Sequence, residues 1–227
     1  MRKVLISVDL MGGDNKITTP IHGIKEFLKV NSDVAFLAFG TKEAKEAIKP
    51  LMGERLEFIE TETYIASEDD PLSAMRRGKN SSMFMAIKSV ADGLASASVS
   101  AGNTGALMAI SKLCFKTLEG IARPAIANII PTKKDFTLLL DMGANLECEP
   151  RNFYEFALMG QAFVSAVCGI SNPTVAILNI GTEEIKGTNL VKNSYALFKE
   201  KFSPEVFKGF EEGDKIMHGN VNVIVTD

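Results

Sequence analysis

The stretch "SASVSAGNTGALMAISKLCFK" (96–116) places a short strand-like run, a polar glycine loop and a helical pattern directly after one another. Small and β-branched residues over 96–101 are typical of a buried strand, and the apolar spacing over 104–116 is typical of a helix that packs on a sheet. The stretch therefore predicts a strand–loop–helix unit, which is the repeating element of α/β proteins.

The same alternation continues along the rest of the chain. Further strands are expected at 3–10, 34–40, 56–61, 125–131, 136–143, 174–181 and 221–227, and further helices at 20–30, 41–52, 81–93, 151–168 and 188–202. Strands that alternate with helices predict a mostly parallel sheet with helices on its faces, in an α/β/α sandwich.

We expect a single α/β domain over 1–227, with a loop-like excursion at "SEDDPLSAMRRGKNSS" (67–82). The chain stops at Asp227, immediately after an apolar strand, where such a domain normally continues into a covering helix. We therefore also expect that the C-terminal part of the domain is missing and that the chain is truncated.

Composition limits the classes of function. The 227 residues are 46% hydrophobic and 23% charged, which is typical of a globular protein, and the net charge of −3 gives no general attraction to nucleic acid. The three cysteines include no CxxC pair, which argues against a disulfide framework and a structural zinc site. No signal peptide is apparent, and we expect a cytoplasmic protein.

Five strand candidates end in small and polar residues. These endings are "DLMGGD" (9–14), "SAGNTG" (100–105), "DMGAN" (141–145), "NIGTEEIKG" (179–187) and "VTD" (225–227). Ligands of open α/β sheets bind outside the carboxyl ends of the strands, so the five loops together predict one site. For any single loop taken alone, an ordinary turn is the favoured interpretation of glycine after a strand, and only the five loops together favour a site.

The 100–105 loop has the features of an anion site. Backbone at its two glycines can approach a ligand, short polar side chains offer hydrogen bonds, and a helix N-terminus follows; the residues are Ser100, Gly102, Asn103, Thr104 and Gly105. The loop has neither the GK[ST] of a P-loop nor a GxGxxG pattern, so inorganic phosphate fits it better than a nucleotide. An ordinary helix cap is the alternative interpretation.

The other loops carry ionisable residues. Asp9 and Asp14 flank Gly12 and Gly13, and Asn145 follows in the 141–145 loop. Carboxylates at strand ends can orient groups, accept a proton or bind metal, and the spacing does not choose among these roles. Lys186 follows two glutamates, and its alternative interpretation is a solvated surface lysine.

Taken together, these motifs resemble one known family. "VDLMGGD", "SSMFMA", "SAGNTGALM", "LEGIARPA", "DMGAN", "NPTVAILNIGTEEIKG" and "NVNVIVTD" occur in this order over essentially the whole chain. They closely resemble the bacterial PlsX family of phosphate acyltransferases (acyl-ACP:phosphate transacylases). The resemblance implies a parallel-rich α/β/α sandwich similar to phosphotransacetylases and to isocitrate and isopropylmalate dehydrogenases.

The resemblance also implies a reaction and its partners. A fatty acyl group would pass from acyl carrier protein to inorganic phosphate, and the acyl phosphate would serve the glycerol-3-phosphate acyltransferase of phospholipid synthesis. No organic cofactor is implied, and we assign no metal site. The family implies a homodimer with peripheral membrane association at the inner face of the cell membrane, and no nucleic acid.

Individual residues of this sequence match the family positions that the resemblance assigns to these roles. Lys186 and Asp227 match family positions that we expect to be catalytic, with Lys186 holding phosphate or the developing oxyanion and Asp227 orienting it or accepting a proton. Asn103 and Thr104 match the phosphate-side loop. Five further residues match the positions that line the rest of the family's substrate cleft, namely Asp9, Gly12, Gly13, Asp14 and Asn145. The basic cluster Arg76, Arg77 and Lys79 is a candidate docking patch for the acidic carrier protein, or else a solvated loop.

Three rival functions stay open at this point. A short-chain phosphotransacetylase would use coenzyme A thioesters in place of acyl carrier protein. A dehydrogenase of the related fold would need a nicotinamide cofactor, for which no dinucleotide fingerprint is present. A non-catalytic scaffold would bind acyl carrier protein without turning it over.

Overall fold

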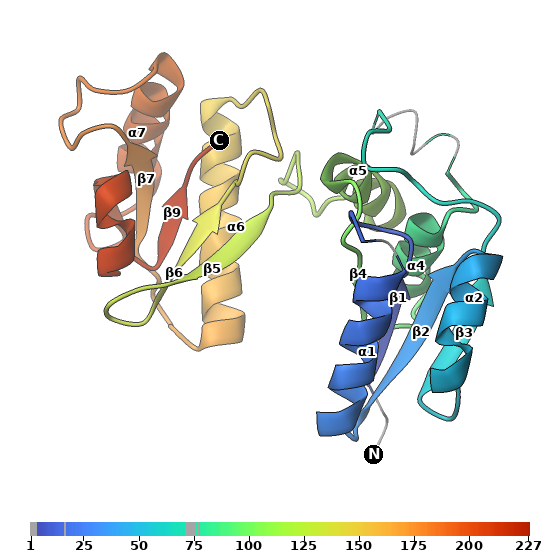
Figure 1. Ribbon diagram of the computed structural model, residues 1–227. Helices are drawn as coiled ribbons and strands as arrows, with labels where there is room; N and C mark the ends of the chain where they lie inside the picture. The colour runs from blue at the N-terminus through green and yellow to red at the C-terminus, as the bar shows by residue number, and fades with distance from the viewer. Residues whose placement is uncertain (1–3, 16, 71–75, 77) are drawn as a thin grey trace. The chain divides into compact units, whose positions relative to one another are not determined.

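The chain folds into two α/β units, Met1–Lys116 and Thr117–Asp227, which are described one at a time (Figure 1). The structure is a computed structural model that describes residues 4–15, 17–70, 76 and 78–227. The expected single domain over 1–227 stays a prediction. In the 67–82 stretch, residues 71–75 and 77 lie outside the described residues.

A four-stranded parallel sheet forms the first unit. Its strands are β1 (Val4–Asp9), β2 (Val34–Gly40), β3 (Leu56–Glu60) and β4 (Ala97–Val99), in the order β3-β2-β1-β4. β1 and β2 are rich in Val, Ile, Leu and Phe, as buried parallel strands require. The edge strand β4 is largely exposed, so the sequence prediction of a buried strand there was wrong. Because all strands run the same way, the loops after β1 and β4 leave from the same edge.

Helices cover both faces of this sheet. Figure 1 shows α1 (Thr18–Val30) and α2 (Lys42–Ile48) on one face, with α4 (Ser82–Ala91) and α5 (Thr104–Phe115) on the other. Helix α2 ends at Ile48 and is followed by a 3₁₀ turn, η1 (Lys49–Leu51), because Pro50 disfavours continuation of the α-helix.

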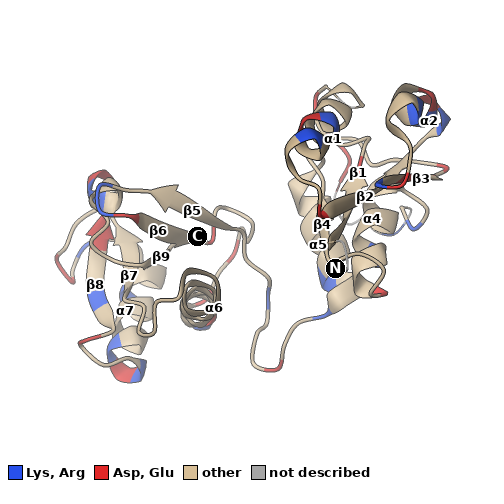
Figure 2. Cartoon of the chain, turned by 90° about the horizontal axis from the view of Figure 1, so that it is seen from below, with Lys and Arg blue, Asp and Glu red and all other residues tan. Residues whose placement is uncertain are grey.

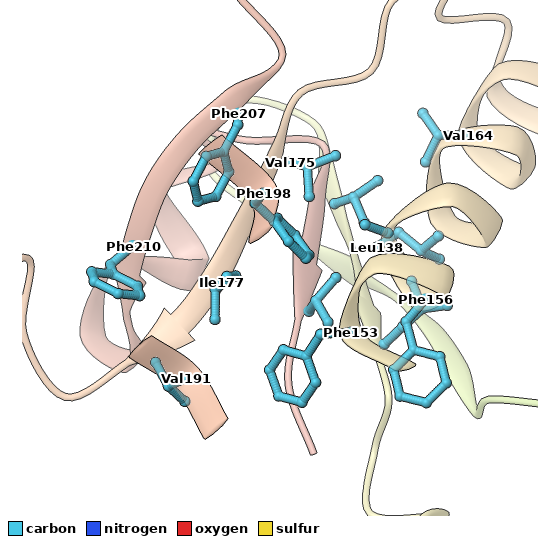
Figure 3. Close-up of a cluster of buried hydrophobic side chains, with 14 residues drawn as sticks. Leu138, Phe153, Phe156, Val164, Val175, Ile177, Val191, Phe198, Phe207 and Phe210 are labelled. Carbon is cyan, nitrogen blue, oxygen red and sulfur yellow. The ribbon is translucent and has the colours of Figure 1, made fainter. Parts of the chain in front are cut away.

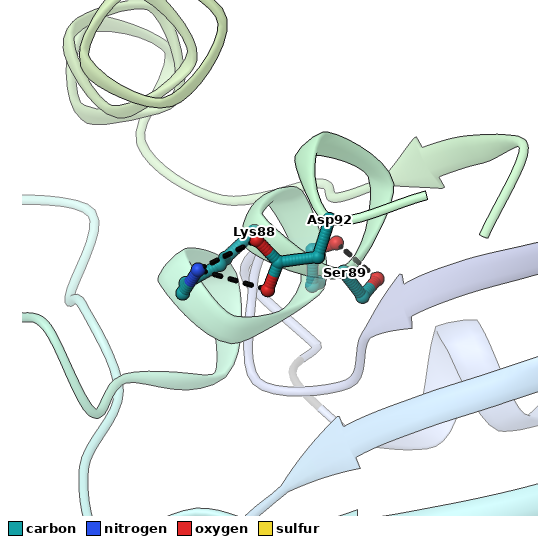
Figure 4. Close-up of polar contacts among 4 residues, drawn as sticks. Lys88, Ser89 and Asp92 are labelled. Carbon is teal, nitrogen blue, oxygen red and sulfur yellow. Dashed lines mark hydrogen bonds and ion pairs between the residues drawn. The ribbon is translucent and has the colours of Figure 1, made fainter. Parts of the chain in front are cut away.

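Helix α4 shows how local chemistry sets helix boundaries. The Ser81 hydroxyl accepts a hydrogen bond from the Phe84 amide at 3.3 Å and so caps the N-terminus. At the other end Lys88 pairs with Asp92 at 2.7 Å, and the Ser89 hydroxyl donates to the Ala86 carbonyl at 2.7 Å (Figure 4). The exposed Lys88–Asp92 pair contributes little to the stability of the helix. The buried apolar face of α4 therefore supplies most of that stability.

The second unit is built on a five-stranded sheet. Its strands are β5 (Ala127–Pro131), β6 (Phe136–Leu140), β9 (Val223–Val225), β7 (Val175–Asn179) and β8 (Phe207–Glu212), in that spatial order. β5 pairs antiparallel with β6, and every other pair in the sheet is parallel. The carboxyl ends of β6, β9, β7 and β8 therefore share one edge.

Side chains of this sheet alternate between two apolar clusters. The larger cluster packs against α6 (Pro150–Cys168) and α7 (Asn189–Lys201), with Phe153, Phe156 and Phe198 fully buried between helices and strands (Figure 3). A smaller cluster on the opposite face includes Ile224 and contacts the 3₁₀ helix η2 (Gly213–His218). Both faces of β9 are thus buried, which explains its uniformly apolar sequence.

These observations confirm the predicted fold class, and each predicted strand and helix has a counterpart. Strand β8 was not predicted, and the hairpin of β5 and β6 adds an antiparallel pair. Figure 2 shows β6, β9 and β7 without charged residues, as their buried positions demand. Within the described part of the chain, no helix is long and apolar enough to cross a bilayer.

Two helical glycines allow a matched test of packing. A Cβ at Gly160 of α6 would stand 2.5 Å from Val223 Cγ1 and 2.9 Å from Leu140 Cδ1, whereas a Cβ at Gly23 of α1 would meet nothing within 4 Å. We expect Gly160→Ala to lower the free energy of unfolding by about 1–3 kcal/mol through overpacking. Gly23→Ala should raise it by roughly 0.5–1 kcal/mol through helix propensity.

Urea denaturation of each variant measures both changes. Equal and stabilising effects of the two substitutions would show that α6 does not approach β9 and β6 as closely as described.

Candidate functional site

Two glycine loops of the first unit touch backbone to backbone. They follow the parallel neighbours β1 and β4, so the topology brings them to the same edge. A Cβ at Gly12 would lie 2.5 Å from the Gly102 nitrogen, and one at Gly102 would lie 2.7 Å from Met83 Cε. Gly13 has a φ of +86°, which favours glycine. Close backbone approach therefore explains the glycine at position 12, and the positive φ explains the one at position 13.

A buried carboxylate links the same two loops. Asp9 is 3% exposed; one of its oxygens accepts from the Ser100 hydroxyl at 2.7 Å, and the other accepts from the Met11 amide at 3.0 Å. The Ser100 hydroxyl oxygen in turn accepts from the Gly102 amide at 3.1 Å. Asp9 thus holds the two loops together, and its role at the predicted site stays a prediction.

Asn103 caps helix α5. Its side-chain oxygen accepts from the Ala106 amide at 2.9 Å, and its amide nitrogen donates to the carbonyls of Ser67 and Asp69 at 2.8 and 2.9 Å. The Asn103 side chain is therefore a helix cap, which was the alternative interpretation of this loop. It also ties the 67–69 segment to the loop. Its phosphate-binding role stays a prediction.

The remaining candidates of the first unit face solvent. Asp14, Thr104 and Gly105 are exposed, and Thr104 and Gly105 form the first turn of α5, where backbone N–H groups point away from the helix. Of the basic cluster, Arg76 and Lys79 are exposed, and Arg77 lies outside the described residues.

In the second unit, a buried aspartate organises the loop after β6. Asp141 is 0% exposed; one oxygen accepts from the Ile126 amide at 2.7 Å, and the other accepts from the Asn145 backbone and side-chain nitrogens at 2.8 and 2.9 Å. Asn145 also donates to the Pro124 carbonyl at 2.9 Å. The Asn145 side-chain nitrogen therefore donates two hydrogen bonds that hold this loop.

Lys186 lies in the loop after β7. The lysine is exposed, and its backbone N–H donates to the Glu183 carbonyl at 3.0 Å. Glu184 accepts from the Tyr195 hydroxyl at 2.7 Å and pairs with Lys199 at 3.2 Å. These contacts lower the pKa of Glu184, with the Tyr195 hydrogen bond as the largest cause. Glu184 is thus directed to α7, and Lys186 is the basic group that the loop presents to solvent.

A pocket of about 520 Å³ opens beside this loop. It lies at the carboxyl ends of β7 and β9 and at the start of α7, where the Thr188 hydroxyl caps the helix by accepting from the Val191 amide at 3.3 Å. Its lining consists of Leu178, Asn179, Ile180, Gly187, Thr188, Val191, Gly213 and Thr226. The mixed apolar and polar lining is typical of small-molecule sites.

Asp227 ends the chain between the loops after β6 and β7. Pairing of β9 with both strands places it there, and the Asp141 amide donates to the Thr226 carbonyl at 3.0 Å. Burial raises the pKa of the nearby Cys148 thiol, and the charges of Asp227 and Asp141 raise it further. The thiol is therefore protonated at neutral pH, which suits a packed side chain and not a nucleophile.

The predicted site residues thus fall into two groups. Asn145, Lys186 and Asp227 share the carboxyl edge of the second sheet, while the others described belong to the first unit. That both groups line one crevice stays a prediction. Sequence reasoning missed Asn179, whose position directly before "IGTEE" was its only signal. Among the described residues, no three His, Cys, Asp or Glu side chains gather as metal ligands would.

Known protein families and structures match this chain. A family model described as "Fatty acid synthesis protein" matches residues 4–227. The chain belongs to this family. A relative from Pelagibacter ubique is 41% identical over 100% of this chain and 69% of its own length, and one from Rhodospirillum rubrum is 43% identical over 99% and 65%. Both are named phosphate acyltransferase.

This member of the fatty acid synthesis family spans about two thirds of the length of the relatives that it matches. Among solved structures, a phosphotransacetylase from Streptococcus pyogenes matches with a TM-score of 0.65 at 16% identity, and the EutD phosphotransacetylase from Staphylococcus aureus matches with 0.62 at 18%. Each match covers 98% of this chain and 77% of the other. These matches confirm the predicted phosphotransacetylase-like fold.

The two bonding roles of Asn103 can be separated experimentally. Asn103→Ala removes both the cap and the bonds to Ser67 and Asp69, so we expect a loss of about 1–2 kcal/mol in the free energy of unfolding. Asn103→Asp keeps the capping oxygen and should cost less. Urea denaturation measures the two losses, and proteolysis near 67–69 should quicken in both variants. An Asn103→Asp variant with unchanged proteolysis would contradict the described bonds to the 67–69 segment.

Proposed function

We propose that this chain transfers a fatty acyl group from acyl carrier protein to inorganic phosphate, forming an acyl phosphate for phospholipid synthesis. The observation that carries the proposal is the family membership over residues 4–227, together with relatives above 40% identity that are named phosphate acyltransferase. The phosphotransacetylase neighbours support the fold, and their identities are too low to support a substrate.

The second unit offers groups that suit this reaction. Lys186 and Asp227 lie at the carboxyl edge of its sheet, beside the pocket of about 520 Å³. Large exposed apolar side chains lie in the loops that leave this edge, namely Met142, Leu146, Ile180 and Ile185. Exposed apolar residues around a pocket are typical of a binding surface for an apolar group, and a fatty acyl chain is such a group.

The chemistry follows from charge. A phosphate oxygen attacks the thioester carbonyl carbon, a C–O bond forms, and the C–S bond breaks to release the thiolate of the carrier, which takes up a proton. Negative charge grows on the carbonyl oxygen on the way, and the Lys186 ammonium stabilises that charge more strongly in the transition state than before it. Asp227 orients Lys186 or accepts the phosphate proton.

The first unit supplies the phosphate side of the reaction in this proposal. Thr104 and Gly105 present backbone N–H groups and a hydroxyl at the N-terminus of α5, while Asp9 and Ser100 hold the loop in shape, with Ser100 accepting from the Gly102 amide. Bringing phosphate and thioester together contributes the larger share of the rate, because a thioester is already activated.

The wider setting belongs to the same proposal. Arg76, Arg77 and Lys79 attract the acidic carrier protein. The protein acts as a cytoplasmic homodimer, associates peripherally with the inner face of the membrane, and passes acyl phosphate to a glycerol-3-phosphate acyltransferase.

Trapping the product tests the proposal. The purified protein is incubated with long-chain acyl carrier protein and phosphate, and acyl phosphate is converted to a hydroxamate with hydroxylamine. We expect phosphate-dependent hydroxamate, and a fall of about a hundredfold or more in Lys186→Ala, because one oxyanion donor is lost. Lys208→Ala, at an exposed lysine of β8, is the matched control and should keep full activity.

The acyl donor that the protein prefers distinguishes between the rival functions. Turnover of acyl-CoA in preference to the acyl carrier protein would favour a phosphotransacetylase. Binding of the carrier protein without any hydroxamate would favour the scaffold. Unchanged turnover in Lys186→Ala would remove that lysine from the mechanism.

A further inference from the structure

Asn179 closes the loop that carries Lys186. It is the last residue of β7 and only 8% exposed. Its side-chain amide donates to the Gly181 carbonyl at 3.0 Å and to the Lys186 carbonyl at 3.3 Å. One buried amide therefore joins the beginning of the loop to its end.

Glycines on both sides make this closure possible. Gly187 has a φ of +88°, and a Cβ there would collide with Asn179 Oδ1. A Cβ at Gly181 would lie 3.1 Å from Lys186 Cγ, so the lysine stem passes directly over this glycine. Any side chain at Gly187 would displace the asparagine, and one at Gly181 would crowd the lysine.

The backbone of Lys186 is consequently fixed at both of its peptide groups. Its N–H donates to the Glu183 carbonyl at 3.0 Å, and its carbonyl accepts from Asn179. Only the side chain is then free to change direction, and its Cγ lies close to Gly181. An exposed lysine on an unrestrained loop would spread its ammonium group over many positions.

We propose that Asn179 is a positioning residue that acts through Lys186, setting where its ammonium group stands relative to the reacting carbonyl. The inference rests on the proposed function, because it concerns the same lysine. A displacement of about 1 Å at a reacting centre can cost about a hundredfold in rate, so a buried amide that holds the loop influences turnover through the position of the lysine.

Substitution of Asn179 by aspartate tests this role. The carboxylate donates no hydrogen bond and faces two carbonyl oxygens, so we expect kcat to fall about ten- to a hundredfold with a much smaller change in KM. When protonated at lower pH, the introduced carboxyl group regains one donor. Turnover of N179D should therefore recover towards acid pH relative to the unsubstituted protein, which a loss of packing alone would not produce.

A double-mutant cycle gives the decisive comparison. In the Lys186→Ala background, measured at high protein concentration, Asn179→Asp should cause no further fall, since there is no ammonium group left to misplace. Asn193→Asp, at an exposed asparagine of α7, makes the same chemical change and should have no effect in either background. Asn179→Ser, which is uncharged, is measured in parallel in case the aspartate variant does not fold.

The outcomes separate the two proposals. Equal losses from the Asn179 substitution with and without Lys186 would overturn the positioning role while leaving the proposed function intact. Absence of acyl phosphate from the unsubstituted protein would overturn the proposed function, and the positioning role would fall with it.

Discussion

The parallel pairing of β9 between β6 and β7 is the constraint on which the second unit depends. Only Val223–Val225 form this strand, yet all three residues are buried and pair with Leu138–Leu140 on one side and Val175–Ile177 on the other. Without this strand, β6 and β7 would have no shared neighbour. The loops that follow β6 and β7 would then no longer lie at the edge of one sheet. Its apolar character supplies the stability, and its position supplies the geometry of the site.

Three asparagines perform a common task at the carboxyl edges of the two sheets. Asn103 donates to the carbonyls of Ser67 and Asp69, Asn145 donates to the Pro124 carbonyl, and Asn179 donates to the carbonyls of Gly181 and Lys186. Loop carbonyls near a sheet edge lose part of their water and need partners. A short amide side chain provides two donors without adding charge to the loop.

Much of the fold could be predicted from sequence because most of its parallel strands are largely apolar and the helices between them have periodic apolar residues. β8 escaped prediction because "FKGFEE" mixes charge with two phenylalanines, and Gly209, with a φ of +83°, breaks the alternation. The loops were found through their small residues, but their hydrogen-bond partners lie far away in sequence, as Ser67 does from Asn103. Asn179 looked like ordinary turn chemistry, because only the folded loop brings Lys186 back to it.

The place of Asp227 depends on β9 being held as firmly as its neighbours β6 and β7 in the sheet. Amide hydrogen exchange of Asp141 and Thr226 measures this directly, because these N–H groups donate to the Thr226 and Leu140 carbonyls across the β6–β9 pair. We predict that both amides exchange only with unfolding of the second unit, as slowly as those of α6. Exchange of both at the rate of an unstructured chain end, while α6 stays protected, would contradict the account, because Asp227 would then have no fixed place beside the 180–187 loop.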